Sequence, residues 1–389
     1  KVKSPAGEET IESQALISAV GQLNRPKMPD IAGITSFEGP YFHSAQWDHS
    51  VDLTGKVVAV IGSGASASQL IPEVAIQARE LKVFQRTPNY YVPVPNYHDA
   101  VPDGLQWLFR HIPGYAQWYR FWLFWTSAEG LLAMAEVAPD WQPGQPSLGP
   151  KNDELRMMLS AYLQASFADR PDLLEKVLPQ YPPASKRIVL DNGIWVQALH
   201  RENVQLITEL IDEVTPRGIR TSDGVEHEVD VIVYATGFQA SHFLTPMKVS
   251  GRNGADLHQT WDGDARAYMG ITLPQFPNFF MLYGPNTNIV VNGSIVYFSE
   301  CEVQYLMACL RMLLERGATS LECKQDVHDA YNERIDAGNL RMAWGVAEVP
   351  SWYRNEKGRS AQNWPFTLLE YWKQTREANP ADYVLAGAP

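Results

Sequence analysis

The sequence has few cysteines, no excess of basic residues and no long uncharged apolar run. Its 389 residues include only Cys301, Cys309 and Cys323, and none of these has a cysteine or histidine partner at zinc-ligand spacing. Three cysteines are too few to stabilise a chain of this length by disulfide bonds. We therefore expect no disulfide framework, no metal site and a reducing compartment, the cytoplasm.

The formal net charge of −12 argues against a nucleic-acid surface, which needs a basic face. We also expect no transmembrane segment, because every apolar stretch of about 18 residues is broken by charge. The nearest approach is 118–137, which Arg120, Glu129 and Glu136 interrupt. This stretch fits a membrane-surface helix, a buried amphipathic helix or a pocket wall.

A dinucleotide-binding pattern, G-x-G-x-x-A, follows the apolar run 57–61 and precedes a predicted helix, 69–80. The first glycine permits a tight turn, the second lets the backbone approach a pyrophosphate, and the alanine lets helix and strand pack closely. Strand, turn and helix are all in place, so we expect this segment to bind a dinucleotide. Its residues are Gly62, Ser63, Gly64, Ala65, Ser66 and Ala67.

The end of the next predicted strand, 81–86, indicates which dinucleotide binds. NAD sites place a carboxylate there to bind the ribose 2′-hydroxyl, whereas this chain has Gln85, Arg86 and Thr87. An arginine suits a 2′-phosphate through charge-assisted hydrogen bonds, and the threonine adds a hydroxyl donor. We therefore predict NADPH as the ligand and not NADH.

Two short apolar strands that end in glycine turns flank this unit. They lie at 11–21 and 228–238, and we expect both to belong to sheets with covered faces. The chain would leave a nucleotide-binding domain near Gly21 and return to it after Gly237. Between these points, 100–183 is rich in aromatic residues and proline and is predicted to be a mostly helical insert.

A second motif just upstream of the fingerprint indicates the reaction type. Residues 37–48 match F-x-G-x-x-x-H-x-x-x-W-[PD], the fingerprint of Baeyer–Villiger monooxygenases. A single histidine is more often an interior residue than a functional one, but five fixed positions before a dinucleotide turn reverse that expectation. The chain thus resembles this family of class B flavin-dependent monooxygenases. The matching positions are Phe37, Gly39, His43, Trp47 and Asp48.

The resemblance covers nearly the whole chain. Residues 83–88 look like the family's 2′-phosphate segment, Lys186 and Arg187 like its second cofactor-contacting strand, and 235–238 like its return to the FAD domain. Three further segments look most like the 4-hydroxyacetophenone monooxygenase branch, namely 351–355, 363–365 and 369–372.

The implied fold is α/β, with two Rossmann-like dinucleotide-binding domains, an incomplete FAD domain and a mostly helical insert in the NADPH domain. The implied boundaries are 1–52 for a remnant of the FAD domain plus linker, 53–99 and 185–225 for the NADPH domain, 100–184 for the insert and 226–389 for the C-terminal part of the FAD domain.

The resemblance implies FAD and NADP as cofactors, with a ketone and O2 as substrates. In the family the flavin, reduced by NADPH, forms a C4a-peroxyflavin that converts the ketone to an ester or lactone. The protein supplies charge stabilisation and excludes water. The resemblance leaves the oligomeric state open.

The resemblance also assigns roles to single residues near the NADPH site. Arg187 would stabilise negative charge on the reacting groups, which suits a permanently cationic side chain, although a surface ion pair is the alternative. Lys186 and Arg86, with Thr87, would hold the 2′-phosphate. Trp352 would be a mobile-loop tryptophan that closes over the cofactor, or simply a packed aromatic.

Other assignments concern the FAD side and the linker. Thr236, Gly237 and Asn286 would lie beside the flavin, although the turn 283–288 that contains Asn286 also reads as an ordinary glycine–proline turn. The motif positions 37–48 would form a linker that couples NADPH binding to domain motion.

One element of the family pattern is absent from this sequence. The family opens with a G-x-G-x-x-G strand–turn–helix for the ADP moiety of FAD, and none precedes Gly21. We therefore expect this chain to be a C-terminal fragment of a longer enzyme that binds FAD poorly and is inactive alone.

Two other functions remain open. An N- or S-oxidising flavin-containing monooxygenase shares the two-dinucleotide layout, but it usually lacks the aromatic insert and differs at the position of Trp47. A non-catalytic NADPH-binding module would have no need of Arg187. Aryl ketones are expected as substrates because of the branch resemblance.

The rings of the insert could line an apolar pocket, pack the insert or form a subunit contact, and we favour packing. They are Trp107, Trp118, Tyr119, Phe121, Trp122, Phe124 and Trp125.

Overall fold

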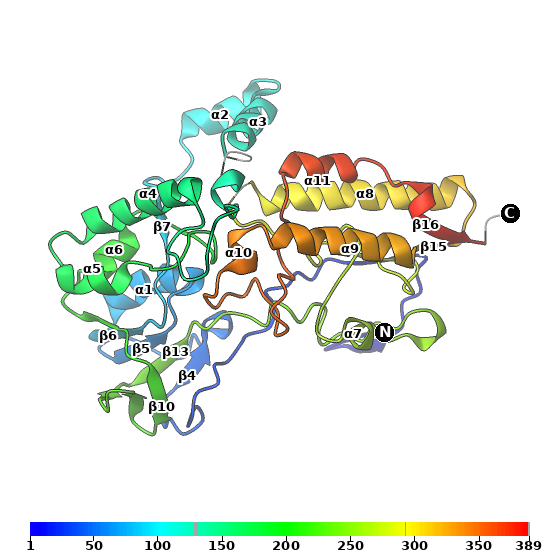
Figure 1. Ribbon diagram of the computed structural model, residues 1–389. Coiled ribbons are helices and arrows are strands. Elements are labelled where there is room, and N and C mark those ends of the chain that lie inside the picture. The colour runs from blue at the N-terminus through cyan, green and yellow to red at the C-terminus, as the bar shows by residue number, and fades with distance from the viewer. Residues whose placement is uncertain (128–130, 292, 388–389) are drawn as a thin grey trace.

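The computed structural model describes residues 1–127, 131–291 and 293–387. These residues form two α/β bodies that lie next to each other (Figure 1). One is built on a parallel sheet. In the other, long helices pack over short strand pairs. A pair of helices stands out from the top of the molecule in this view. The mixed α/β class predicted from the sequence is confirmed.

The first body is built on a five-stranded parallel sheet of described residues, in the order β4-β13-β5-β6-β9. The strands are β4 (Tyr41–His43), β13 (Val231–Tyr234), β5 (Val57–Ile61), β6 (Glu80–Phe84) and β9 (Val204–Ile207). Helix α1 (Ala65–Gln77) connects β5 to β6 as the dinucleotide pattern predicts. The near-continuous apolar sequences of β5 and β13 suit strands that are buried on both faces.

Alternate residues of these strands pack into two separate cores. Val58 and Val60 face α1, α6 (Ile194–Leu199) and the insert, where they contact a cluster that includes Ile71 and Trp195. Residues of the opposite parity, such as Ala59, pack against a three-stranded antiparallel sheet. That sheet consists of β10 (Ile211–Thr215), β11 (Gly218–Thr221) and β12 (Glu226–Glu228).

The insert between β7 (Tyr91–Pro93) and β8 (Val189–Asp191) is mostly helical, as predicted. Its helices are α2 (Asp103–His111), α3 (Tyr115–Ser127), α4 (Pro150–Ser166) and α5 (Pro171–Val177), with the 3-10 helix η2 (Leu132–Met134). Helix α4 contributes Leu163 to the core over the sheet, whereas no residue of α2 is buried. The stretch 118–137 includes 128–130, which lie outside the described residues.

In the second body, helices pack around a parallel strand pair, β3 (Leu16–Ser18) and β14 (Phe279–Met281). The helices are α7 (Leu257–Trp261), α8 (Ile295–Glu315), α9 (Gln325–Asn339), α10 (Ala343–Val346) and α11 (Leu368–Gln374). Strands β15 (Ser320–Cys323) and β16 (Tyr383–Ala386) form an antiparallel pair beside them, and β1 (Val2–Ser4) pairs with β2 (Gly7–Glu9). The short 3-10 helices are η1 (Ser44–Gln46), η3 (Arg252–Gly254) and η4 (Pro380–Asp382).

Two sequence expectations differ from the structure. The sheet that contains β5 also takes in β4 and β13, which the predicted boundaries placed in or beside the FAD domain. The strand β13 pairs with β5 in register, and a three-residue strand such as β4 is too short to leave a pattern in the sequence. The expected covered sheet at 11–21 is wrong in this chain, because Leu16 and Ile17 of β3 are 58% and 43% exposed.

Two expected absences concern membranes and metals. None of the helices in the described part of the chain has both the length and the apolar character that a membrane crossing requires. Within the same ranges, no cluster of three or more histidine, cysteine or acidic side chains has an arrangement that could hold a metal ion. Cys301, Cys309 and Cys323 are buried thiols that are not joined in disulfides.

Candidate functional site

The dinucleotide turn has the backbone geometry that its sequence predicts. Gly62 has a φ of +122°, and a Cβ atom built on it would lie 2.4 Å from the carbonyl oxygen of Ala235, which directly follows the neighbouring strand β13. Both features demand glycine. Ala67 is fully buried between α1 and the sheet, which is the close helix–strand contact that a small residue permits.

The N-terminus of α1 is open to solvent at Gly64. A Cβ atom built on Gly64 would meet no atom within 4 Å, and both Gly64 and Ser66 are exposed. The turn itself is fixed by side-chain bonds: Ser63 Oγ donates to the Thr87 carbonyl at 3.0 Å, and Asn89 Nδ2 donates to the Ser63 carbonyl. A rigid turn that presents the free N–H groups of a helix is a ready anion site.

Two cationic side chains lie near this turn: Arg86 directly precedes Thr87, which is bonded to Ser63, and Lys186 lies close enough to Arg86 for its charge to act on it. Arg86 is exposed after β6, and Lys186 lies before β8 with its ammonium 5.6 Å from the centre of the Tyr181 ring. Burial, and to a smaller extent the nearby positive charge of Arg86, lower the pKa of Lys186 to about 8. Two cations that repel each other here gain stabilisation from an anion between them. Gln85, by contrast, is buried and donates to the Lys176 carbonyl at 2.8 Å.

The linker motif lies at the edge of the same sheet. His43 ends β4 and is buried; its Nδ1 accepts from the Ala45 backbone N–H at 3.1 Å, and its ring lies 5.8 Å from that of Phe238. Burial lowers the pKa of His43, opposed by a hydrogen bond with the Gly237 backbone. The structure thus brings together two predicted segments that are almost 200 residues apart in the sequence.

The other linker positions have structural tasks. Phe37 is buried, and the Cβ absent from Gly39 would lie 2.7 Å from its ring. Trp47 packs on Phe42 with ring centres 5.0 Å apart. Asp48 is exposed and accepts from the backbone N–H of Ser50 at 2.9 Å, as in a local turn. These contacts fix the shape of the linker, and its coupling role stays a prediction.

The predicted FAD-side residues are largely bonded to the protein itself. Thr236 Oγ1 donates to the Lys27 carbonyl at 2.6 Å, and the Gly237 carbonyl accepts from the Lys27 N–H at 2.9 Å. Asn286 is buried, and its Nδ2 donates to the carbonyls of Ser360 and Asn363 at 2.8 and 3.1 Å. The side chains of Thr236 and Asn286 therefore hold loops together, which sequence reasoning did not foresee.

Arg187 lies close to two loops of the second body that were predicted to contact the cofactors, the turn 283–288 and the segment 351–355. It is exposed, and its positive charge opposes the burial that raises the pKa of Tyr283 and of Tyr353. Trp352 is partly buried, with its ring 4.8 Å from that of Tyr353. The segments 186–187, 283–288 and 351–355 therefore meet where the two bodies approach each other.

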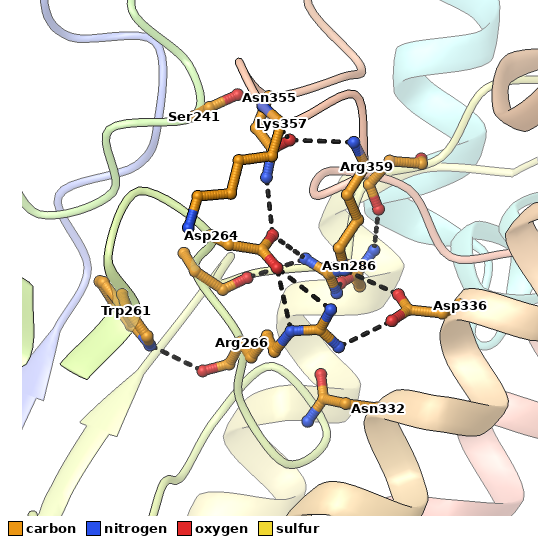
Figure 2. A network of polar contacts seen from close by, with 12 residues as sticks. Ser241, Trp261, Asp264, Arg266, Asn286, Asn332, Asp336, Asn355, Lys357 and Arg359 are labelled. Atoms are coloured by element: carbon orange, nitrogen blue, oxygen red, sulfur yellow. Dashed lines mark hydrogen bonds and ion pairs between the residues drawn. The ribbon is translucent and has the colours of Figure 1, made fainter.

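A buried polar network holds the 351–364 segment to the 283–288 turn, and Figure 2 shows it. Arg359 donates to Asn286 Oδ1 at 2.7 Å, to Asp336 at 2.7 Å and to Asp264 at 3.1 Å. Arg266 bridges the same two carboxylates from the other side. Sequence reasoning missed this network, because nothing in the spacing of Asp264, Asp336 and Arg359 links them.

Glu302 is a second residue that no pattern in the sequence indicated. It lies on α8, is fully buried, and its Oε2 accepts from the backbone N–H of Tyr283 at 2.9 Å. Burial raises the pKa of Glu302 to about 8. This carboxyl therefore fixes the start of the turn that contains Asn286.

Two hollows lie elsewhere on the chain. One of them, of about 310 Å³, is lined by Trp261, Asp264, Arg266, His328 and Lys357, among others, and so borders the polar network. We place the candidate site at the Gly62 turn, because the helix N-terminus is open there and the charged pair Arg86 and Lys186 lies beside it.

Comparison with known proteins agrees with this geometry. Residues 7–93 match the family model described as flavin-binding monooxygenase-like (FMO-like). A Baeyer–Villiger monooxygenase of Pseudomonas aeruginosa is 35% identical over 378 residues, which cover 97% of this chain and 69% of that protein. The chain belongs to the Baeyer–Villiger monooxygenase family. The family resemblance predicted from the 37–48 motif is thus confirmed.

Two further similarities place the chain within this family. The uncharacterized monooxygenase y4iD of Sinorhizobium fredii is 38% identical over 98% of the chain, and the chain spans 58% of its length. The crystal structure of OTEMO in complex with FAD and NADP superposes with a TM-score of 0.77 at 28% identity, covering 97% of this chain and 76% of that one. The predicted fold class is confirmed by this match. The 4-hydroxyacetophenone branch stays a prediction.

Proposed function

We propose that this Baeyer–Villiger family chain acts in an NADPH- and FAD-dependent monooxygenase. The overall reaction consumes a ketone, O2, NADPH and a proton, and yields an ester or lactone, NADP+ and water. In this proposal the 389 residues supply the whole NADPH site and the C-terminal part of the FAD-binding body. The observation that carries the proposal is that Arg86 and Lys186 lie near each other beside the Gly62 turn, whose helix N-terminus is open at Gly64.

The residues present fit NADPH. The pyrophosphate would bind at the α1 N-terminus, where the missing Cβ of Gly64 leaves room for it. The 2′-phosphate would bind between Arg86 and Lys186, with the Thr87 hydroxyl as a further donor. The absence of a carboxylate after β6 removes the group that would repel that phosphate.

The fit to FAD is partial. Ser18 Oγ and Tyr353 Oη are buried and have no hydrogen-bond partner among the described residues, so they are available to a ligand between the bodies. Thr236 and Asn286 already use their side chains within the protein, so they would support FAD through loop position and backbone. We therefore expect these 389 residues alone to hold FAD weakly and to show little turnover.

Arg187 and its neighbours Trp352 and Tyr353 are assigned the following roles in this proposal. Bound FAD and NADPH supply the redox chemistry with O2. Arg187 supplies a fixed positive charge for an oxyanion at the reacting carbonyl, and it keeps that charge at any working pH. Tyr353 is buried near the charge of Arg187, and Trp352 packs beside it; in this proposal the two rings would help to keep water from the reacting groups.

A titration with two dinucleotides tests the NADPH part. We expect NADP+ to bind to the 389-residue chain at least tenfold more tightly than NAD+. Equal affinities for NADP+ and NAD+ would contradict the proposal. The oxygenation part is tested with added FAD, NADPH and a ketone, by following the ester and NADPH oxidation. Amine oxidation without any ester formation would favour the N-oxidising alternative.

The finer substrate class rests on resemblance alone. The segments 351–355, 363–365 and 369–372 resemble the 4-hydroxyacetophenone monooxygenase branch, and we propose aryl ketones on that ground. A panel that pairs aryl methyl ketones with cyclic aliphatic ketones tests it. A clear preference for the cyclic ketones would sink the proposal.

A further inference from the structure

The last part of the insert places a tyrosine ring against one of the two cations assigned to the 2′-phosphate. The ammonium of Lys186 lies 5.6 Å from the centre of the Tyr181 ring, a distance at which a cation and an aromatic face attract each other. Both side chains are partly buried. No pattern in the sequence indicated Tyr181, because a tyrosine at the end of the insert belongs to no dinucleotide motif.

Hydrogen bonds fix this ring to the segment that follows Arg86. Tyr181 Oη donates to the Pro88 carbonyl at 2.9 Å, and Tyr90 Oη donates to the Tyr181 carbonyl at 2.8 Å. The rings of Tyr90 and Tyr181 also meet edge to face, with their centres 5.4 Å apart. Tyr181 is thus held by its side chain and by its backbone, and turning the ring away from Lys186 would break the bond to Pro88.

The same segment is tied to the dinucleotide turn. Ser63 Oγ donates to the Thr87 carbonyl at 3.0 Å, and Asn89 Nδ2 donates to the Ser63 carbonyl. Residues 87 and 89 therefore contact the turn, whereas residues 88 and 90 contact Tyr181. The segment 87–90 links the turn to the ring that lies against Lys186.

The other surroundings of Lys186 disfavour its charge. Burial, and to a smaller extent the like charge of Arg86, lower its pKa to about 8, and no carboxylate of the described residues is among the groups that offset them. A carboxylate would attract the ammonium but would also repel a phosphate, whereas an aromatic face attracts the ammonium and carries no net charge. The Tyr181 ring can therefore hold the ammonium and leave it free to bind an anion.

We propose that Tyr181 is a positioning residue for the 2′-phosphate, and that through it the insert takes part in the choice of NADPH over NADH. The ring holds the Lys186 ammonium near Arg86, and the bonds to residues 88 and 90 set the place of this pair beside the Gly62 turn. The inference rests on the proposed function, since it assumes that the dinucleotide binds at this turn.

Titration of the 389-residue chain with NADP+ and NAD+ tests the proposal without any need for turnover. Tyr181→Leu removes the aromatic face, so it should weaken NADP+ binding roughly tenfold and change NAD+ binding little. Tyr181→Phe keeps the face and loses only the hydroxyl, so its NADP+ affinity should stay within about threefold of that of the unmodified chain.

Two further measurements separate a positioning role from a merely structural one. The aromatic face favours the protonated amine, so in Tyr181→Leu the decrease of NADP+ affinity with rising pH should begin at lower pH, and in Tyr181→Phe it should not move. Pentafluorophenylalanine at position 181 has nearly the shape of phenylalanine, but its ring face does not attract cations. A chain that carries it should bind NADP+ as weakly as Tyr181→Leu, which keeps the test decisive if Tyr181→Leu fails to fold.

The matched control is Trp372→Leu, which removes the ring of a cation–π pair in the second body, where the Arg376 guanidinium lies 4.8 Å from the ring centre. It should bind both dinucleotides as the unmodified chain does.

Three results would overturn the inference and leave the proposed function intact: an unchanged NADP+ preference in Tyr181→Leu, equal losses for NADP+ and NAD+ in that variant, or equal losses in Tyr181→Leu and Tyr181→Phe. Equal affinities of the unmodified chain for NADP+ and NAD+ would overturn the proposed function, and this inference with it.

Discussion

Gly62 and Ala235 approach so closely that a Cβ atom on Gly62 would lie 2.4 Å from the Ala235 carbonyl oxygen, at a φ of +122°. Gly64, two residues further on, has ordinary dihedral angles and open space where its Cβ would be. The two glycines of one motif therefore serve different ends. The first makes the turn possible, and the second leaves room for a ligand.

The variant pair Gly62→Ala and Gly64→Ala separates these two roles. We expect Gly62→Ala to lower the free energy of unfolding by about 2–4 kcal/mol, through steric clash and backbone strain. Gly64→Ala should leave stability unchanged within about 0.5 kcal/mol and weaken NADP+ binding at least tenfold. Denaturant unfolding and NADP+ titration measure both. Full NADP+ affinity in Gly64→Ala would contradict the placement of the pyrophosphate.

Arg86 should set the preference for NADPH. Arg86→Ala removes a charge-assisted hydrogen bond worth about 1.5–3 kcal/mol, so NADP+ affinity should fall roughly 10- to 100-fold while NAD+ affinity changes little. The control is Arg79→Ala, which removes an exposed arginine of the same charge after α1, before β6. Two results would show that Arg86 does not recognise the 2′-phosphate: equal losses of affinity for NADP+ and NAD+ in Arg86→Ala, or a loss of NADP+ affinity in Arg79→Ala as large as that in Arg86→Ala.

The pH dependence of NADP+ binding should report on Lys186. Burial lowers the pKa of Lys186 to about 8, and only the protonated amine attracts the 2′-phosphate. Affinity for NADP+ should therefore be full well below this pKa and decrease as pH rises through it. NAD+, which lacks that phosphate, should show no such decrease, nor should NADP+ with Lys186→Met. Isothermal titration at several pH values between about 6 and 9 gives the comparison.

Glu302 should make the fold less stable as pH rises. Its pKa is raised by burial to about 8, while the unfolded carboxyl ionises near its usual value of 4.5. Between these values the folded state holds a proton that the unfolded state has lost, so the free energy of unfolding falls with rising pH, by a few kcal/mol in all. Glu302→Gln should lose this part of the pH dependence. Urea unfolding at both ends of the range measures it, and an unchanged slope in the variant would refute the assignment.

Arg359 should hold the 351–364 segment in place. Its side chain is 11% exposed and joins Asp264, Asp336 and Asn286 (Figure 2). Arg359→Leu leaves those partners short of a cation and should cost about 3 kcal/mol of stability and speed hydrogen exchange in 351–364. Lys357→Ala, which removes an exposed ion pair with Asp262 nearby, should change stability by less than about 1 kcal/mol. Similar exchange rates in both variants would show that the network does not hold the segment.

Local patterns in the sequence predicted much of the first body. The run 57–61, the turn at Gly62 and the following helix form a contiguous unit whose periodicity and glycines have local physical causes. The same holds for Arg86, since its position at a strand end follows from chain order. The family motif at 37–48 lies within a dozen residues and needs no tertiary information to be read.

Long-range relationships could not be read in this way. The pairing of β4 with β13 and the meeting of His43 with Phe238 join segments almost 200 residues apart. The engagement of Thr236 and Asn286 in loop contacts, and the raised pKa of Glu302, depend on which groups surround them after folding. The exposure of Trp107, Trp118 and Trp125 on α2 and α3, where we had favoured packing, could not be predicted either, because a tryptophan-rich helix has the same sequence whether it is packed or not.

The sequence by itself determined the dinucleotide turn, the preference for a 2′-phosphate and the family, because each depends on residues close together in the chain. Only the tertiary structure decided which side chains remain free for a ligand and which form hydrogen bonds within the protein. The physical reason is that hydrogen bonds and burial are settled between distant segments. A glycine at 62 is required by its own turn, but it is the carbonyl of Ala235, just after a strand far along the chain, that excludes every other residue there.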